Sequence, residues 1–511
     1  MEVDSSAPTA KTLKTNKEQN TADTGQTLTN LPDSILQLIL SFLPTKQAVR
    51  TSILSKRWRY LWMSVHNLVF DEYEPPVHSE GDESDEYDPP AHSEADESDE
   101  YEPPDHSEGD GKRLLFMNFV QRVLLLRDSS DMKKFTLSCD VLSDASRVST
   151  WVSAAVRHNV EDLILHFDNI EVEHSFVLPH GLFSCQTLRK LELHMIYDLK
   201  LPSVISLSKL TVLYLKDVIF PDDHLTQKLF SCCPLLENLT LENCDWQNVT
   251  AVSISGPKLE RVMIVDRTDP IVEAESDDDE SNDQDGEVVD PHGGDMTGCQ
   301  VVIFGTNLHN YNYVGNLRTD FRLYNSSPLV YASLYMRSTR IEASFRAHKL
   351  LGELSGVKHI IMQPATFKVL KCAEELLPHL PTFYNLNTLL IMDGQIDFAC
   401  KGLLSMLQNS PQLNHLDIRS VISLSTHDEE QDDWKLEPVP PCLISHLKTI
   451  DMWTFLGSED EMHVVKVLLR TATALEKMCF SFLSLIKNQA ELYEQIKKFP
   501  RASLNCEISL L

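Results

Sequence analysis

The amino-acid sequence predicts a mixed α/β protein in which a short helical module precedes a long solenoid of parallel strands and helices. Three observations lead to this prediction: an apolar stretch with helical spacing near residue 30, a phrase of spaced leucines that recurs along the chain, and a hydrophobic content of 42% over 511 residues. That content suffices for a sizeable core. Repeated units of this kind stack side by side because none can bury its apolar edge alone.

The net charge of −31 is concentrated in two segments of the chain. Residues 71–110 contain eighteen Asp and Glu and no Lys or Arg, and residues 273–290 contain ten and none. The rest of the chain is close to neutral. Proteins that bind nucleic-acid phosphates need positive charge, so this composition argues against a nucleic-acid partner.

The N-terminal part of the chain divides into a polar tail and a helical module. Residues 1–27 are polar and aperiodic, and we expect a disordered tail there. Residues 28–70 predict three short helices, of which the first has Asp33 or Ser34 at its start and Pro44 at its end. The first helix has apolar residues on more than one side, too many for a three-helix unit to bury. Surplus apolar surface on a small module indicates a partner site.

The two acidic segments contain no pattern that could build a core. Residues 71–111 repeat with a period of 14 and predict an extended, self-repelling linker. Residues 268–297 predict a disordered acidic loop. Four serines here have Asp three residues downstream, a pattern that suits an acidophilic kinase; phosphorylation would tune docking or attract a basic partner, and an inert charged spacer is the simpler alternative. These serines are Ser79, Ser93, Ser107 and Ser276.

Residues 112–433 carry a phrase with apolar residues at its first, fourth and sixth places. CQTLRKLEL, SKLTVLYL and PLLENLTL are clear examples, and nine copies recur at comparable spacing, the last two beyond residue 433. L-x-x-L-x-L with a period of about 20–29 residues is the leucine-rich-repeat signature, in which short parallel strands stack into a curved solenoid. An ordinary α/β domain with chance phrases is the alternative. Residues 298–350 lack clean copies, so the sequence does not place strands there.

The strand positions between the buried leucines would line the concave face of such a solenoid. They mix charged residues with one aromatic, Tyr214, and an aromatic at such a place can anchor a target protein. A solvated strand face would look the same in a single sequence. The predicted target-binding residues are Lys190, Glu192, His194, Tyr214, Lys216, Thr240 and Glu242.

Two segments resemble known modules. LPDSILQLILSFLPTKQAVRTSILSKRWRYLW, within residues 28–70, resembles the plant F-box. Residues 434–480 resemble the FBD domain, so an FBD segment followed by C-terminal strands is expected over 434–511. With the repeats between these modules, the chain is identified as a member of the plant F-box/FBD/leucine-rich-repeat family. The two acidic segments have no counterpart in that family.

The resemblance implies a substrate-recognition subunit of a Skp–cullin–F-box ubiquitin ligase. The F-box would dock on the Skp-type adaptor, and through it reach the cullin and the RING subunit, while the repeats bind a target protein. The alternative is a protein-interaction scaffold that binds the adaptor outside a cullin ligase. By the resemblance, the residues that serve adaptor contact or the packing of the F-box itself are Leu31, Pro32, Ile35, Leu36, Ile39, Leu43 and Trp58.

No catalytic residue, metal or cofactor is expected in this chain. Ubiquitin transfer in this ligase class needs no nucleophile in the receptor, which contributes proximity. The sequence lacks the common nucleotide-binding, hydrolase and zinc-protease motifs. An apparent calcium loop around Gly286 would place His292, not Glu, at its twelfth position. The eleven cysteines include no C-x-x-C pair.

No targeting or membrane segment is apparent in the sequence. The start of the chain has no apolar signal-peptide core, and no stretch approaches the roughly 20 apolar residues of a membrane span. We therefore expect a protein of the cytoplasm and/or the nucleus, without a membrane partner.

Overall fold

The computed structural model describes residues 31–73, 107–141, 144–168, 176–266, 298–324, 329–338, 340–392, 394–425, 434–484, 486 and 488–511. The predicted tail 1–27, most of the predicted linker and the predicted loop 268–297 lie outside the described residues. The same is true of Ser79, Ser93 and Ser276, so phosphorylation at these serines stays a prediction.

Four short helical elements form the N-terminal module: α1 (Asp33–Leu40), α2 (Thr45–Arg50) and the 3₁₀ helices η2 (Thr51–Ile53) and η3 (Trp58–Ser64). Prolines precede both α-helices, where a missing N–H removes no intrahelical hydrogen bond. The second predicted helix is therefore α2 continued by η2, and the third is the 3₁₀ helix η3.

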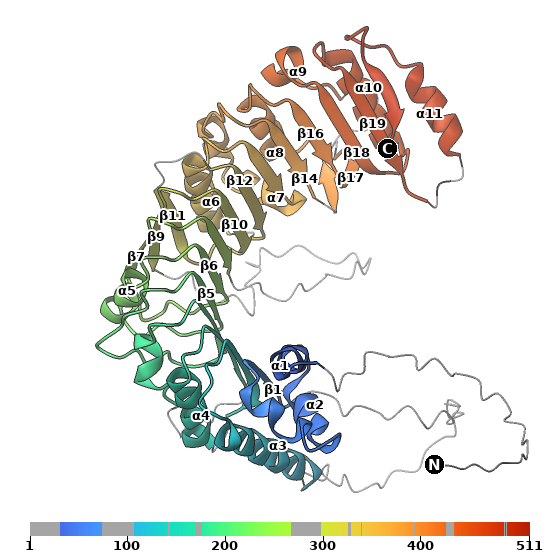
Figure 1. Cartoon of the computed structure of the whole chain (residues 1–511). Helices are drawn as coiled ribbons and strands as arrows, with labels where there is room; N and C mark the ends of the chain where they lie inside the picture. Colours follow the sequence, from blue (N-terminus) through green and yellow to red (C-terminus); the bar gives the residue numbers. More distant parts are fainter. Residues whose placement is uncertain are drawn as a thin grey trace, which may run out of the picture.

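Fifteen parallel strands form one continuous sheet that curves from the N-terminal module to the C-terminus (Figure 1). The strands of this sheet line the inner side of the arc, and the helices that connect them cover its outer side. This architecture confirms the predicted α/β solenoid. In spatial order the strands are β1 (Asn67–Asp71), β2 (Lys134–Asp140), β3 (Asp162–Asp168), β4 (Lys190–Met195), β5 (Val212–Lys216), β6 (Asn238–Glu242), β8 (Arg261–Val265), β10 (Asn310–Gly315), β12 (Tyr331–Met336), β13 (His359–Met362), β14 (Thr388–Ile391), β16 (His415–Ile418), β18 (Thr449–Phe455), β19 (Lys477–Phe482) and β20 (Glu507–Leu510).

Two smaller sheets and a row of helices complete the described repeats. One small sheet contains β7 (Ala251–Ser255), β9 (Gln300–Phe304) and β11 (Asp320–Tyr324), and the other contains β15 (Gln395–Asp397) and β17 (Val421–Ser423). The helices between the strands are α3 (Ser107–Leu126), α4 (Ala145–Arg157), η5 (His180–Ser184), α5 (Asp223–Ser231), α6 (Ile341–Glu353), α7 (Pro364–Lys371), η6 (Glu374–His379), α8 (Lys401–Gln408), α9 (Pro441–Ser445), α10 (Glu459–Thr471) and α11 (Gln489–Lys497).

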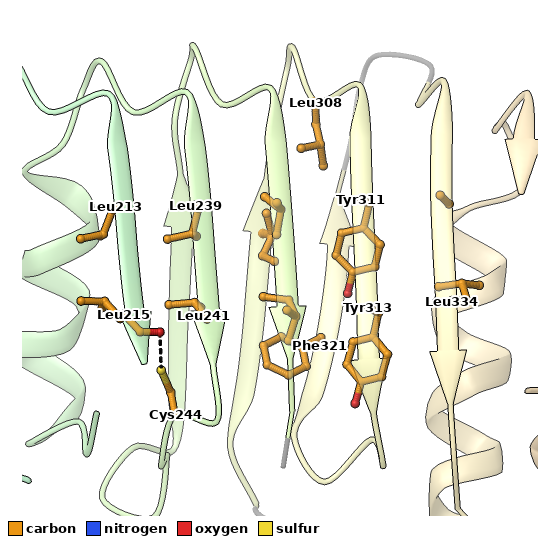
Figure 2. Close-up of a cluster of buried hydrophobic side chains, with 14 of the residues drawn as sticks. Leu213, Leu215, Leu239, Leu241, Cys244, Leu308, Tyr311, Tyr313, Phe321 and Leu334 are labelled. Atoms are coloured by element: carbon orange, nitrogen blue, oxygen red, sulfur yellow. Dashed lines mark hydrogen bonds between the residues drawn. The ribbon is translucent and has the colours of Figure 1, made fainter. Parts of the chain in front are cut away.

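Alternate residues of the large sheet point into one continuous apolar core. Leu213 and Leu215 of β5 lie beside Leu239 and Leu241 of β6, and all four are almost completely buried (Figure 2). The intervening residues lie on the inner face of the arc. This is the period-two pattern of a strand that is covered on one side.

The region in which the sequence placed no strands follows the same plan with different core residues. Tyr311 and Tyr313 of β10 are fully buried at the places that leucines occupy in neighbouring strands (Figure 2). Residues 308–313 therefore form a copy of the repeat phrase with two tyrosines, and the Tyr313 hydroxyl donates a hydrogen bond to Asp266 Oδ2 at 3.1 Å.

The N-terminal module is continuous with the solenoid. Strand β1 follows η3 directly and pairs along its whole length with β2. Two side chains close the junction: Thr45 Oγ1 accepts a 2.7 Å hydrogen bond from the Val69 N–H, and the buried Arg127 guanidinium donates to the Val65 carbonyl. The described ends of the predicted linker 71–111 therefore belong to the folded body, with Asp71 in β1 and residues 107–111 in α3, while the linker between them stays a prediction.

The residues before and after the acidic segment 74–106 lie in the same part of the fold. Residues 107–111, assigned above to the linker, belong to α3, so Ser107 is a helical residue. Arg113 of α3 donates to both carboxylate oxygens of Glu72 at 3.0 and 3.1 Å and also contacts Asp144 at 3.0 Å. The Tyr73 hydroxyl donates to Asp140 Oδ1 at 2.6 Å. These contacts join the residues on either side of 74–106.

Candidate functional site

Helix α1 presents apolar side chains to solvent. Leu36 and Leu40 are fully buried beneath it. On another side, Ile35, Leu38 and Ile39 are 41%, 54% and 37% exposed, and Phe42, just beyond the helix, is 77% exposed. We call these four residues the α1 face. Their i, i+3, i+4, i+7 spacing is the pattern of a helix side that packs against something, yet no described part of the chain covers it.

The N-terminal end of α1 is tied to the third helical element. Arg57 donates to Asp33 Oδ1 through Nε at 2.8 Å and through Nη2 at 2.6 Å, and it also donates to the Leu31 carbonyl. Asp33 lies in the first turn of α1, where a carboxylate interacts favourably with the helix dipole. Arg57 thus orients α1 with its apolar face outward.

The seven residues predicted for adaptor contact or packing fall into three groups. Pro32, Ile35 and Ile39 are exposed, and Leu31 and Leu43 are half-buried. Leu36 and Trp58 are 0% and 7% exposed, so both pack the module itself and neither lies on its surface. Leu36 and Trp58 thus fit the second part of the prediction, the packing of the module itself.

Other apolar residues of the module are exposed as well, although they were not among the residues predicted for adaptor contact. Leu38 and Phe42 complete the α1 face, and their helical spacing with Ile35 was the available signal. Ile53, Leu54 and Tyr60 are 87%, 65% and 58% exposed in the rest of the module. No periodicity marks these three, because they lie in and around short 3₁₀ helices.

The residues predicted to bind a target lie on the inner face of β4, β5 and β6, where most of them pair with a neighbouring side chain. Lys190 Nζ lies 2.7 Å from Glu192 Oε1. Lys216 Nζ lies 2.8 Å from Glu242 Oε1, and the Tyr214 hydroxyl also donates to Glu242. The remaining two are His194, 2.8 Å from Asp217, and Thr240, which lies beside Tyr214 in the strand register.

The electrostatics of this group reflect its internal pairing. Burial alone would raise the pKa of Glu242, but hydrogen bonds from Lys216 and Tyr214 outweigh it, so the pKa is lowered. The hydrogen bond to Glu242 raises the pKa of Lys216, and burial together with the same carboxylate raises the pKa of Tyr214. At neutral pH the group is therefore an ionised lysine–glutamate pair with a neutral tyrosine.

Further along the arc the inner face carries apolar side chains among polar ones, such as Asn312 and Ser333, which lie between Met263 and Ile361 in the strand register. Met263 of β8 is 39% exposed, and Tyr331 of β12 is 50% exposed with its ring stacked 4.7 Å from that of His359. Ile361 and Leu390 continue the second row of the sheet and are half-buried. We call Met263, Tyr331, His359, Ile361 and Leu390 the apolar inner surface. The leucine phrase gave no signal for it, because these residues occupy the variable places of the repeat.

The described residues offer no cluster for a metal ion, and Cys233 lies in surroundings that disfavour a reactive thiolate. No group of three or more His, Cys, Asp and Glu that could hold a metal ion is found in this part of the chain. Cys233 is buried, and burial raises its pKa to about 12, which disfavours the nucleophilic thiolate. Gly286 and His292 lie outside the described residues. Among the helices that the structure describes, none combines the length and the apolar character needed to cross a bilayer.

Three family models match the chain. The F-box domain model matches residues 28–70, the model described as "FBD-associated F-box protein At5g56370, LRR repeats" matches 148–276, and the FBD model matches 436–480. None of these three models describes a catalytic domain.

Known proteins of Arabidopsis thaliana align over nearly the whole chain. F-box/LRR-repeat protein At4g14096 is 27% identical, with 95% of this chain and 94% of the relative covered. F-box/FBD/LRR-repeat protein At4g00160 is 26% identical, with 94% and 93% covered. F-box/LRR-repeat protein At4g14103 is 33% identical over 46% of this chain and 54% of its own length. Two of these three alignments thus extend over the helical module, the repeats and the C-terminal segment of this chain.

Proposed function

Because the chain belongs to the family of plant F-box/leucine-rich-repeat proteins with a C-terminal FBD domain, we propose that it is the substrate-recognition subunit of a Skp–cullin–F-box ubiquitin ligase. The observation that carries this proposal is the α1 face, four apolar side chains between 37% and 77% exposed on a module of about forty residues. A Skp-type adaptor that covers this face would link the chain to the cullin and the RING subunit.

The α1 face, with Pro32 beside it, would form the centre of the adaptor contact. Apolar side chains that lose all their water on binding supply most of the affinity of an interface. Leu36 and Leu40 would support this contact from beneath, because they fix α1 on the module. Asp33 and Arg57 would lie at its edge, where a charge pair adds specificity more than affinity.

A rigid junction between F-box and solenoid suits the proposed role. A receptor without a nucleophile can speed ubiquitin transfer only by holding the target at a suitable distance and orientation. The pairing of β1 with β2, together with the hydrogen bonds of Thr45 and Arg127, would keep the adaptor face in a fixed relation to the inner face of the arc.

The target would bind the inner face of the solenoid, with different parts contributing differently. The apolar inner surface would supply affinity, since Met263 and Tyr331 lose exposed apolar area when covered. The charged residues of β4–β6 would supply specificity, because a partner has to match or replace their existing pairs.

The test is the affinity of a purified plant Skp-type adaptor for the full chain. A double variant, Ile35→Asp with Ile39→Asp, places two carboxylates on the α1 face. We expect adaptor affinity to fall by at least about 100-fold, because each lost hot spot typically costs about 2 kcal/mol or more. The matched control is Leu114→Asp with Leu125→Asp on α3, leucines that are 57% and 72% exposed; this variant should bind within about twofold of the parent.

The same variants separate the ligase from the scaffold alternative. Co-precipitation from plant extract should recover cullin together with the adaptor for the parent and the α3 control, and neither protein for the α1 variant. Recovery of the adaptor without cullin would favour the scaffold. Equal adaptor affinity of the α1 variant and the control, with unchanged thermal unfolding of both, would contradict the proposed docking face.

A further inference from the structure

A pocket of about 330 Å³ lies in the FBD region, between the segment that begins at Trp434 and helix α10. Its volume is at the lower end of the range of about 300–1,000 Å³ that is typical of small-molecule sites. The pocket lies away from the α1 face in sequence and faces no strand of the apolar inner surface, since its lining comes from residues 434–439 and 463–471 alone. Neither the adaptor contact nor the target surface uses these residues.

Positive charge gathers in the lining of this pocket. Lys435, Lys466 and Arg470 contribute three cations and Glu437 one carboxylate, on a chain whose net charge is −31. Lys466 and Arg470 are four residues apart on α10 and therefore lie on the same helix side. Within the described chain neither of these two makes an ion pair. Two like charges on one helix side are mildly unfavourable, and an anion bound between them would turn this into a favourable interaction.

The same pocket has an apolar part, which is held in place by packing and a hydrogen bond. The Trp434 ring packs edge-on against Phe398 and against His463, with a ring-centroid distance of 6.2 Å in each case. His463 Nε2 donates a 3.0 Å hydrogen bond to the Trp434 carbonyl oxygen, which ties the segment to α10. Val439 and Val467 complete the apolar lining. A wall that is already fixed loses little entropy when a ligand binds.

We propose that this pocket binds a small organic anion, with its phosphate or carboxylate group between Lys466 and Arg470 and its apolar body against Trp434. The guanidinium of Arg470 can donate two parallel hydrogen bonds to such a group, while Lys466 acts as a point charge. The apolar wall selects an anion with an aromatic or aliphatic part over an inorganic one. The FBD region would then be a ligand-binding element at the C-terminal end of the solenoid.

Titration calorimetry on the full chain with three probes tests the proposal: phenyl phosphate, benzoate and inorganic phosphate. Phenyl phosphate should bind about tenfold or more tightly than inorganic phosphate, because its ring is buried against Trp434. Benzoate shows whether a carboxylate suffices. The double variant Lys466→Gln with Arg470→Gln should lose at least tenfold of the phenyl phosphate affinity. Lys209→Gln with Lys258→Gln, two exposed lysines outside the pocket, is the matched control and should bind as the parent does.

One competing occupant belongs to the chain itself. Five carboxylates, Asp428, Glu429, Glu430, Asp432 and Asp433, precede Trp434 in the sequence. A variant with Asn and Gln at these positions distinguishes the two cases. Phenyl phosphate binding by the parent supports the proposal. Phenyl phosphate binding only by the neutralised variant would overturn the proposal, because the chain's own carboxylates would then occupy the pocket. Equal affinity of the parent and the Lys466/Arg470 variant would also overturn it, because the two cations would then not hold the anion. None of these outcomes bears on the adaptor contact.

Discussion

Helices α1 and α10 contain similar apolar residues and use them differently. In α10 the apolar residues Val464, Val465, Leu468 and Leu469 are all buried against the solenoid. In α1 only Leu36 and Leu40 are buried, and the α1 face remains open. A solenoid helix is covered by the sheet and by its neighbours, whereas a small module has too little chain to cover two sides of one helix. This difference supports the proposal that another protein covers the α1 face.

The two helices also differ in how their N-termini are satisfied. Ser458 caps α10, accepting a 3.2 Å hydrogen bond from the Glu461 N–H, while Glu461 accepts hydrogen bonds from the N–H groups of Leu456, Gly457 and Ser458. Helix α1 begins after Pro32 without a side-chain cap, and its first turn is held by the exposed Arg57–Asp33 pair. Contacts within this protein therefore stabilise α10 more fully than they stabilise α1.

The largest effect expected from this comparison is on α10. Leu468→Ala removes a side chain that is 1% exposed and should cost about 2–5 kcal/mol of local stability, because the cavity cannot refill completely. Leu38→Ala in α1, where the side chain is 54% exposed, should change stability by less than about 0.5 kcal/mol. Native-state hydrogen exchange, read at β18 and β19 for the first variant and at α1 for the second, measures each change where it occurs.

Equal losses for these two variants would contradict the comparison, since they would mean that the described chain covers α1 as well as α10. For adaptor affinity, unlike stability, we expect the opposite order. Leu38 then becomes an interface residue, and its loss lowers adaptor affinity, while Leu468 remains a core residue.

Much of the fold could be predicted from spacing alone, because the repeat phrase reports burial directly. Leu191, Leu213 and Leu239 occupy equivalent core places in adjacent strands. Where Tyr311 and Tyr313 fill those places, a search for leucine fails although the physics is unchanged, since a buried tyrosine needs only volume and, as for Tyr313, a partner for its hydroxyl.

The candidate sites were less predictable, because contact between residues far apart in sequence decides them. Leu36 and Ile39 look equivalent in the sequence, yet one is buried and the other is 37% exposed. Nothing in the sequence shows that Lys216 has an ion-pair partner, but the strand register places Glu242 beside it. Residues 71–111 were predicted to be a linker throughout, because nothing in their composition shows that Glu72 at one end pairs with Arg113 just after the other end.

A smaller effect is expected at the cap of α10. Ser458→Ala leaves the Glu461 N–H without its side-chain acceptor and should cost about 1 kcal/mol. Ser458→Asp retains an acceptor at the same place and should recover most of that loss, since Asp caps helices as well as Ser does. Hydrogen exchange in the first turn of α10 reports both variants. A Ser458→Asp variant as unstable as Ser458→Ala would show that the hydroxyl acts through something other than capping.

The smallest effect is expected at the start of α1. The side chains of Arg57 and Asp33 are 36% and 60% exposed, so their ion pair is largely screened by water, and Arg57→Ala should cost less than about 1 kcal/mol. Arg50→Ala, another exposed arginine of the module, is the matched control. Urea unfolding at low and high salt measures both, and the small loss for Arg57→Ala should shrink further at high salt. A loss above about 2 kcal/mol would mean that the chain secures the start of α1 as firmly as that of α10, and the argument that an adaptor has to complete this helix would then rest on the α1 face alone.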